Sequence, residues 1–256
     1  YWGKANSKTN IPAMNSISLT IDALTSTTHI SINKGSNRNI WVLNGQEQND
    51  LGRINPVMKY LNNISRNKHG CIIESENNFP TSAGLASSAS GVASLVIAYN
   101  HLFELDMSFD QLVQASILGS GSAPRSLLGG IVILDVEDQI VTKSIREPGE
   151  WPLSIIICIT DDKEKNISSR EGMEISRKTS PIYLSWLDSN KKDIEIAKSA
   201  IAEKNLKRLG EVAEKNCYFM HKVMKTSSPP IHYMSNRTKN CIKEITTIRD
   251  TGIDLF

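Results

Sequence analysis

Residues 80–91, which read PTSAGLASSASG, lie between a segment with the pattern of a strand and a segment with the pattern of a helix. Residues 71–75 form a short apolar run, and after the stretch apolar residues recur at three- and four-residue intervals, as on one buried face of a helix. Small residues let a backbone approach a ligand closely, and the start of a helix favours an anion. The stretch therefore predicts a phosphate-binding loop, with Gly84, Ser87 and Ser88 as its candidate contacts.

A helix start rich in serine and alanine for tight packing explains the same stretch equally well when it is considered alone. The stretch is not a Walker A loop, because that loop requires Gly-Lys-Ser/Thr after its glycines. Two further segments favour the phosphate interpretation. Residues 119–126 (GSGSAPRS) and residues 168–173 (SSREGM) each place hydroxyl groups beside an arginine. A surface loop or a helix cap would explain either one alone. Three such segments together indicate a small ligand with several negative charges rather than a protein-interaction surface.

The segments around these loops predict an α+β fold. Apolar and polar residues alternate in some segments and follow helical spacing in others, without a regular βαβ order. Strands are expected over residues 17–32, 40–43, 71–75, 130–134 and 153–159, and helices over residues 55–64, 85–99, 109–117, 179–202, 206–223 and 238–249. Proline and glycine in residues 147–151 interrupt both periodicities, which predicts a boundary between one domain over residues 1–150 and another over residues 151–256.

Composition excludes several classes of protein. The chain has 256 residues, of which 39% are hydrophobic, so it can bury a substantial core. Its 29 basic and 27 acidic residues are scattered, which provides no broad charged surface for nucleic acid or an anionic membrane. No apolar run approaches the roughly 20 residues that a bilayer requires. The four cysteines are far apart in the sequence and suggest neither a zinc site nor a disulfide framework, so a reducing, cytoplasmic setting is expected.

Several motifs occur together and in order along nearly the whole chain. They are YWGK at residues 1–4, IP at 11–12 with NSIS at 15–18, the stretch at 80–91, GSGSAPRS at 119–126 with GG at 129–130, and SR at 169–170 with GM at 172–173. This combination resembles the diphosphomevalonate decarboxylase family, within the GHMP superfamily of small-molecule kinases. YWGK and the GSGSAxRS pattern are specific to the decarboxylase branch, whereas mevalonate, homoserine and galactose kinases share the 80–91 loop.

The resemblance implies a fold and a reaction. The fold is a two-lobed GHMP kinase-like structure, with an N-terminal lobe like domain 2 of ribosomal protein S5 and a ferredoxin-like C-terminal lobe. In the family, ATP with Mg2+ phosphorylates the 3-hydroxyl of the substrate, the 3-phosphate departs, and loss of CO2 gives isopentenyl diphosphate. The protein contributes positioning and charge stabilisation rather than covalent catalysis. The resemblance also makes a homodimer a reasonable expectation.

The resemblance also implies roles for residues at matching positions. One group would hold the 5-phosphate end of the substrate: Tyr1, Lys4, Ser169 and Arg170. Arg125 would grip the carboxylate that becomes CO2, and Ser120 and Ser122 would orient the substrate and the transferred phosphoryl group. Gly84, Ser87 and Ser88 would form the loop that holds the nucleotide phosphates. No residue is assigned to bind a metal directly.

The sequence departs from the family pattern in a few places. The family's essential aspartate lies in a Phe/Met-Asp-Ala-Gly-Pro-Asn segment expected soon after Phe256, so Asp254 is not assigned that role. Pro124 stands where Cys or Ser is usual, Met14 where a small polar residue is common, and residues 117–118 replace a pair that contains arginine. These changes leave two alternatives open. One is a decarboxylase that acts on mevalonate 3,5-bisphosphate without ATP, and the other is a non-catalytic homologue that binds an isoprenoid precursor.

Overall fold

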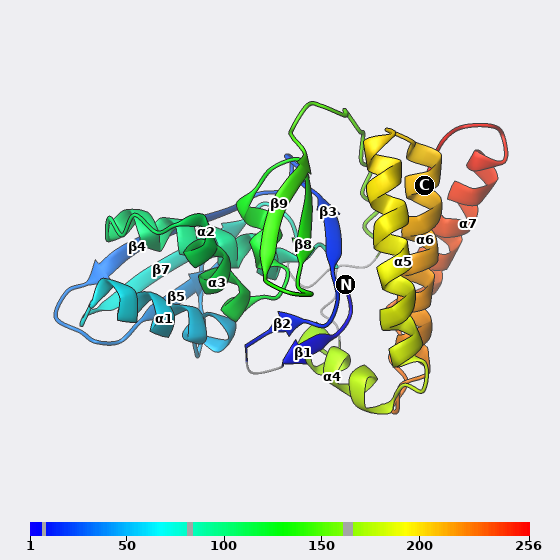
Figure 1. The fold of residues 1–256 in the computed structure, drawn as a ribbon. Coiled ribbons are helices and arrows are strands. Elements are labelled where there is room, and N and C mark those ends of the chain that lie inside the picture. The colour runs from blue at the N-terminus through cyan, green and yellow to red at the C-terminus, as the bar shows by residue number, and fades with distance from the viewer. Residues whose placement is uncertain (7–8, 81–83, 161–165) are drawn as a thin grey trace.

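The computed structural model describes residues 1–6, 9–80, 84–160 and 166–256. This part of the chain forms three sheets, of four, three and two strands. The four-stranded sheet, the three-stranded sheet and a group of helices lie in that order across the molecule (Figure 1). The strands are β1 (Lys4–Asn6), β2 (Ile11–Pro12), β3 (Ser16–Leu19), β4 (Ser26–Asn33), β5 (Ile40–Leu43), β6 (Gln46–Glu47), β7 (Gly70–Asn77), β8 (Ile131–Asp135) and β9 (Val141–Arg146). The helices are α1 (Asn55–Ser65), α2 (Ser87–Leu102), α3 (Phe109–Gly119), α4 (Ser169–Thr179), α5 (Tyr183–Ala202), α6 (Leu206–Lys225) and α7 (Asn236–Arg249), with short 3-10 helices η1 (Gly52–Ile54) and η2 (Ala123–Leu127).

The four-stranded sheet has the order β4-β7-β5-β6. Strand β4 pairs antiparallel with β7 along its full length, and β5 pairs parallel to β7. The apolar faces of α1 and α2 cover this sheet through buried residues such as Leu61, Ile73 and Tyr99. This core fixes the start of α2, which is the element that follows the predicted phosphate-binding loop.

The three-stranded sheet has the order β3-β8-β9. It lies between the four-stranded sheet and helices α5, α6 and α7 (Figure 1). Strand β3 pairs antiparallel with β8, from Ser16 opposite Leu134 to Leu19 opposite Ile131. Because side chains alternate along a strand, Ser16 and Ser18 lie on the same face of β3. That face is turned toward η2, which carries Arg125.

A second core joins the start of the chain to the helical part. Trp2 is 4% exposed and packs in one cluster with Trp186 of α5 and Met224 of α6. The indole Nε1 of Trp2 donates to Ser176 Oγ at 3.0 Å, and the indole Nε1 of Trp186 donates to the backbone oxygen of Trp2 at 3.0 Å. Tyr1 and Lys4, on either side of Trp2, are thereby held at the junction of the sheets and the helices.

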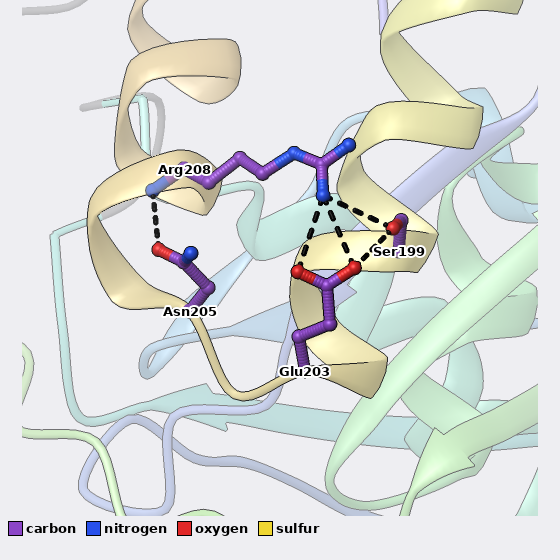
Figure 2. A network of polar contacts seen from close by, with 4 residues as sticks. All are labelled: Ser199, Glu203, Asn205 and Arg208. Atoms are coloured by element: carbon purple, nitrogen blue, oxygen red, sulfur yellow. Dashed lines mark hydrogen bonds and ion pairs between the residues drawn. The ribbon is translucent and has the colours of Figure 1, made fainter.

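A polar network closes the turn between α5 and α6 (Figure 2). Asn205 caps α6 by accepting a hydrogen bond from the backbone nitrogen of Arg208 at 2.9 Å. The guanidinium of Arg208 donates to Ser199 at 3.1 Å and to both oxygens of Glu203 at 3.1 and 3.2 Å. These contacts keep the two long helices antiparallel and side by side.

Most elements expected from the sequence are present, but one is not. Residues 153–159 form no strand, because no segment in the described part of the chain pairs with their backbone. Ile155, Ile156 and Ile159 in this segment are 45%, 79% and 58% exposed. Strand β9 was not anticipated, since its sequence VTKSIR carries few apolar residues. None of the helices described is both long and apolar enough to cross a bilayer.

Candidate active site

Lys4 and Arg170 meet at one buried amide. The Lys4 ammonium donates to Asn10 Oδ1 at 2.5 Å, and Arg170 Nη2 donates to the same oxygen at 3.3 Å. Asn10 is 2% exposed and is oriented by its own amide nitrogen, which donates to the backbone oxygen of Leu118. A single neutral oxygen therefore holds two cationic side chains together. An anionic ligand with several oxygens would satisfy both far better.

Burial, together with neighbouring cations, makes the Lys4 ammonium easier to deprotonate. Burial lowers the pKa of Lys4 to about 8, and the neighbouring charges of Arg170 and Arg53 act in the same direction, while Glu174 opposes them. Burial and the charge of Arg170 also lower the pKa of Arg53. Lys4, Arg53, Arg125 and Arg170 make no ion pair with any carboxylate in the described part of the chain. The excess positive charge is the electrostatic signature of an anion-binding site.

An open pocket of about 490 Å³ lies beside this pair of cations. Ser168, at the N-cap of α4, lines the pocket and accepts a hydrogen bond from the backbone nitrogen of Glu171 at 3.2 Å. The remaining lining residues are Lys4, Arg170, Glu171, Glu174, Ile175, Lys178 and Thr179. Ser169 is the first residue of α4 but is not among those that line the pocket. The pocket therefore extends along α4 from its N-cap, Ser168, to its last residue, Thr179.

Arg125 lies in η2 and is oriented by strand β3. Its Nε donates to Ser18 Oγ at 3.0 Å, and its Nη1 donates to Ser16 Oγ. Burial lowers the pKa of Arg125 to about 10, so the guanidinium remains protonated at neutral pH. Two neutral hydroxyls on one strand thus fix the plane of a charged group that meets no carboxylate among the described residues.

Tyr1 connects the two cationic regions. Burial raises the pKa of its phenol to about 12, against the opposing charges of Arg125 and Arg170, both of which are close enough to act on it. A Cβ added to Gly121 would come within 2.7 Å of the Tyr1 hydroxyl and 2.6 Å of the Asn10 backbone oxygen. The 119–126 segment, the start of the chain and the Lys4–Arg170 pair are therefore parts of one site.

A chain of hydroxyl groups runs from this site to the start of α2. Ser120 Oγ lies 3.2 Å from Ser122 Oγ and 3.3 Å from Ser88 Oγ. Ser87 and Ser88 open α2, whose N-cap residue, Ala86, provides no side-chain cap. The orphan backbone N–H groups of a helix start are well suited to a phosphate.

Gly84 is the described glycine of the loop before α2. Gly84 has φ +93°, and a Cβ added there would meet nothing within 4 Å in the described structure. Thr81, Ser82 and Ala83 of the predicted loop lie outside the described residues. The described part fits a nucleotide phosphate. No group of three or more candidate ligand residues that could hold a metal ion occurs in the described ranges. That absence is compatible with Mg2+ held mainly by phosphate oxygens, as is usual for this ion.

Sequence reasoning missed two residues of the site. Asn10 carries no motif of its own and becomes visible only when the fold brings Lys4 and Arg170 to it. Arg53 lies in η1, outside all three small-residue segments, and its only signal is its electrostatic effect on Lys4. Asp254 is exposed beyond the end of α7, where neighbouring Leu255 accepts a hydrogen bond from Arg249 at 2.5 Å. Asp254 was not assigned to the site, and no contact in the described structure links it to Ser120 or Arg125.

Comparison with known proteins places the chain in a family. The model of the diphosphomevalonate decarboxylase-like N-terminal domain matches residues 1–145, and that of the mevalonate 5-diphosphate decarboxylase C-terminal domain matches residues 155–252. The chain belongs to the diphosphomevalonate decarboxylase family. It is 34% identical to the diphosphomevalonate decarboxylase of Candida albicans, over 99% of this chain and 76% of the relative. It is 32% identical to the diphosphomevalonate decarboxylase of Saccharomyces cerevisiae, over 97% of this chain and 68% of the relative.

Solved structures of the decarboxylase family share the fold. The complex of MDDEF with MVAPP, AMPPCP and magnesium matches with a TM-score of 0.89 and 32% identity, over 99% of this chain and 80% of that one. The mevalonate diphosphate decarboxylase of Staphylococcus aureus matches with a TM-score of 0.87 and 31% identity, over 98% and 78% of the two chains. These matches confirm the α+β, GHMP kinase-like fold expected from the sequence motifs.

Proposed function

We propose that this chain is a decarboxylase that converts mevalonate 5-diphosphate and ATP into isopentenyl diphosphate, CO2, ADP and phosphate. The observation that carries the proposal is the arrangement of cations around Tyr1. The charges of Arg125 and Arg170 both act on the Tyr1 phenol, and Arg170 shares the Asn10 oxygen with Lys4. A substrate with a carboxylate at one end and phosphates at the other would place a negative charge on each cationic region. Membership of a family of decarboxylases supplies the reaction class.

The phosphate end of the substrate would occupy the pocket beside α4. Lys4 and Arg170 would exchange part of their interaction with Asn10 for the phosphate oxygens. Ser169 does not line the pocket, and its role at the start of α4 rests on the family resemblance alone. Tyr1, with its pKa raised to about 12, stays protonated and can donate a hydrogen bond to the substrate. None of these groups changes its bonding during the reaction, so they provide affinity rather than rate.

The carboxylate end would lie against Arg125. A guanidinium whose Nε and Nη1 are held by Ser18 and Ser16 presents its remaining N–H groups in a fixed direction. It can orient the carboxylate so that the bond to the departing CO2 aligns with the bond to the leaving phosphate. Ser120 and Ser122 lie between Arg125 and the start of α2, where they would orient the 3-oxygen of the substrate.

The nucleotide would bind at the start of α2. Its phosphates would meet the backbone of Gly84 and the hydroxyl and backbone groups of Ser87 and Ser88. When bound, ATP with Mg2+ supplies the phosphoryl group that converts the 3-hydroxyl into a leaving group. A relative of this chain has been solved with MVAPP, AMPPCP and magnesium bound together, which supports a ternary arrangement here.

We also propose a cellular location, an oligomeric state and a partner for the protein. We place it in a reducing cytoplasm because the sequence resembles a metabolic enzyme and carries free cysteines. We also propose a homodimer, by analogy with the family, and a domain boundary at residues 147–151. A small phosphorylated mevalonate is the expected partner, rather than nucleic acid or a membrane.

The stoichiometry of the reaction tests the proposal. The purified protein is incubated with mevalonate 5-diphosphate, ATP and Mg2+, and ADP, phosphate, CO2 and isopentenyl diphosphate are each measured. We expect the four products to appear in equal amounts. Formation of ADP without CO2 would instead identify a kinase that lacks the decarboxylation step.

A further inference from the structure

Two cysteines that are far apart in the sequence lie together in the structure. Cys158 is in the extended segment that follows Trp151, and Cys241 is in α7. A hydrogen bond with the Cys158 side chain raises the pKa of the Cys241 thiol, which indicates that the two side chains are close together. A second contact beside them joins the same two segments, since Thr160 Oγ1 and Thr238 Oγ1 are 2.8 Å apart. Thr160 follows Cys158 by two residues, and Thr238 precedes Cys241 by almost one helical turn, so both contacts result from the same packing.

We propose that Cys158 and Cys241 form a reversible intramolecular disulfide when the protein meets a small-molecule disulfide oxidant. The other cysteines do not offer this geometry. Cys71 is fully buried in β7, and among the described residues neither Cys71 nor Cys217 has a recorded contact with another thiol. All four cysteines are free thiols in the structure. The proposed bond is therefore specific to one pair and forms only on oxidation.

The chemistry proceeds by thiol–disulfide exchange in two steps. The thiolate of one cysteine attacks a sulfur of oxidised glutathione, which forms a mixed disulfide and releases one glutathione thiolate. The thiolate of the second cysteine then attacks the protein sulfur of that mixed disulfide. The Cys158–Cys241 bond forms, and a second glutathione thiolate leaves. The protein loses two electrons and two protons, and one glutathione disulfide becomes two glutathione molecules.

The bond would add a restraint to the segment around Cys158. Residues 153–159 pair with no strand among the described residues, and Ile156 is 79% exposed. A bond from Cys158 to Cys241 closes a loop of roughly 80 residues, which restricts the unfolded chain strongly. It also ties the segment that leads toward α4 to helix α7. Oxidation should therefore raise the melting temperature.

The test is peptide mapping after oxidation. The protein is treated with oxidised glutathione, free thiols are blocked with iodoacetamide, and the digest is analysed by mass spectrometry with and without dithiothreitol. We expect one linked peptide pair that joins Cys158 to Cys241, has lost two hydrogen atoms and disappears on reduction. The Cys217→Ser variant should give the same linked pair. Cys158→Ser and Cys241→Ser should each give a glutathione adduct on the remaining cysteine and no linked pair.

The melting temperature provides an independent measurement. It should rise on oxidation by several degrees in the wild-type protein and in Cys217→Ser, and should not rise in Cys158→Ser or Cys241→Ser. Alkylation or glutathione adducts on both Cys158 and Cys241 of the wild-type protein, without the linked pair, would overturn the proposal. A linked pair found only in covalent dimers would also overturn it, because the geometry requires both thiols from one chain.

Discussion

Arg125 is the side chain to which our proposal assigns a role in catalysis rather than in binding. Its Nε and Nη1 atoms are occupied by Ser18 and Ser16, so the rest of the guanidinium faces the site in one orientation. We predict that Arg125→Lys lowers kcat by about 100- to 1000-fold, because an ammonium cannot reproduce a planar, two-point grip on the departing carboxylate. KM for the substrate should change much less.

Steady-state kinetics of the Arg125→Lys variant provide the measurement. Arg38→Lys is the matched control, since Arg38 is 72% exposed and its ion-pair partner is Glu47, away from the site. That control should retain full activity. A kcat for Arg125→Lys close to the wild-type value would remove Arg125 from the chemistry.

Lys4 should give the reaction a specific pH dependence. Burial and two neighbouring arginines lower its pKa to about 8 in the free protein, and only the protonated form attracts phosphate. We therefore predict that kcat/KM falls as the pH rises through about 8, approaching tenfold per pH unit. In the Lys4→Arg variant this fall should be absent up to pH 9.5, since arginine keeps its charge. An identical pH profile for the two proteins would exclude Lys4 from the phosphate site.

The lowered pKa of Lys4 also makes the stability of the folded protein depend on pH. The folded protein holds the Lys4 proton less tightly than the unfolded chain, whose ordinary value is 10.5. Between pH 8 and 10.5 the unfolded chain therefore binds more protons at this residue. The contribution of Lys4 to the free energy of unfolding increases with pH in that window. Keeping Lys4 charged at the site therefore lowers the stability of the folded protein, as is common where function requires unpaired cations.

At the scale of elements, the start of the chain is positioned by a close contact at Gly3. This glycine has φ +135°, and a Cβ there would lie 2.1 Å from the hydroxyl of Tyr183 in α5. We predict that Gly3→Ala lowers the free energy of unfolding by about 2–3 kcal/mol through backbone strain and overpacking. It should also raise KM, because the displaced segment carries Tyr1 and Lys4.

A second substitution separates the two causes of this effect. The Tyr183 hydroxyl is buried without a hydrogen-bond partner among the described residues, so Tyr183→Phe alone should cost little. The double variant Gly3→Ala with Tyr183→Phe should recover part of the lost stability in urea denaturation. Gly35→Ala serves as the control, because its φ is +83° but nothing lies within 4 Å of the added Cβ. If Gly3→Ala were no more destabilising than Gly35→Ala, the contact would not restrain the segment.

The elements that the sequence predicted are those whose pattern is local. The apolar residues of α2, including Val92, Val96 and Tyr99, recur at helical intervals and are buried in the core as expected. The apolar segment at 153–159 was expected to be a strand, but a strand depends on a partner elsewhere in the chain, and periodicity cannot supply one. Strand β9 shows the converse case, because its pairing with β8 forms it despite a weak pattern.

The same distinction applies to the site. Serines and arginines within short segments, such as Ser120, Ser122 and Arg125, could be selected from the sequence because their chemistry and spacing are local. Asn10 and Arg53 could not, since their importance arises from contacts and charge effects across long sequence separations. The sequence therefore predicts the groups that bind anions more readily than the groups that position them.

At the scale of the whole molecule, the candidate site lies where three parts meet. The α1–α3 part provides the start of α2, the central sheet orients Arg125, and the helical part provides Arg170 (Figure 1). Trp2 ties the start of the chain to the helical part through its hydrogen bonds with Ser176 and Trp186. A ligand that spans the site would contact all three of these parts. Binding should therefore stabilise the arrangement of the parts that brings their side chains together.

The central claim is that this site phosphorylates its substrate before removing CO2, and the most direct measurement is CO2 release from two substrates with and without ATP and Mg2+. We predict that mevalonate 5-diphosphate releases CO2 only when ATP and Mg2+ are both present, because the 3-hydroxyl is a poor leaving group until it is phosphorylated. We also predict that mevalonate 3,5-bisphosphate without nucleotide releases CO2 far more slowly than that complete reaction. Rapid CO2 release from the bisphosphate alone, with none from the diphosphate plus ATP, would contradict the account.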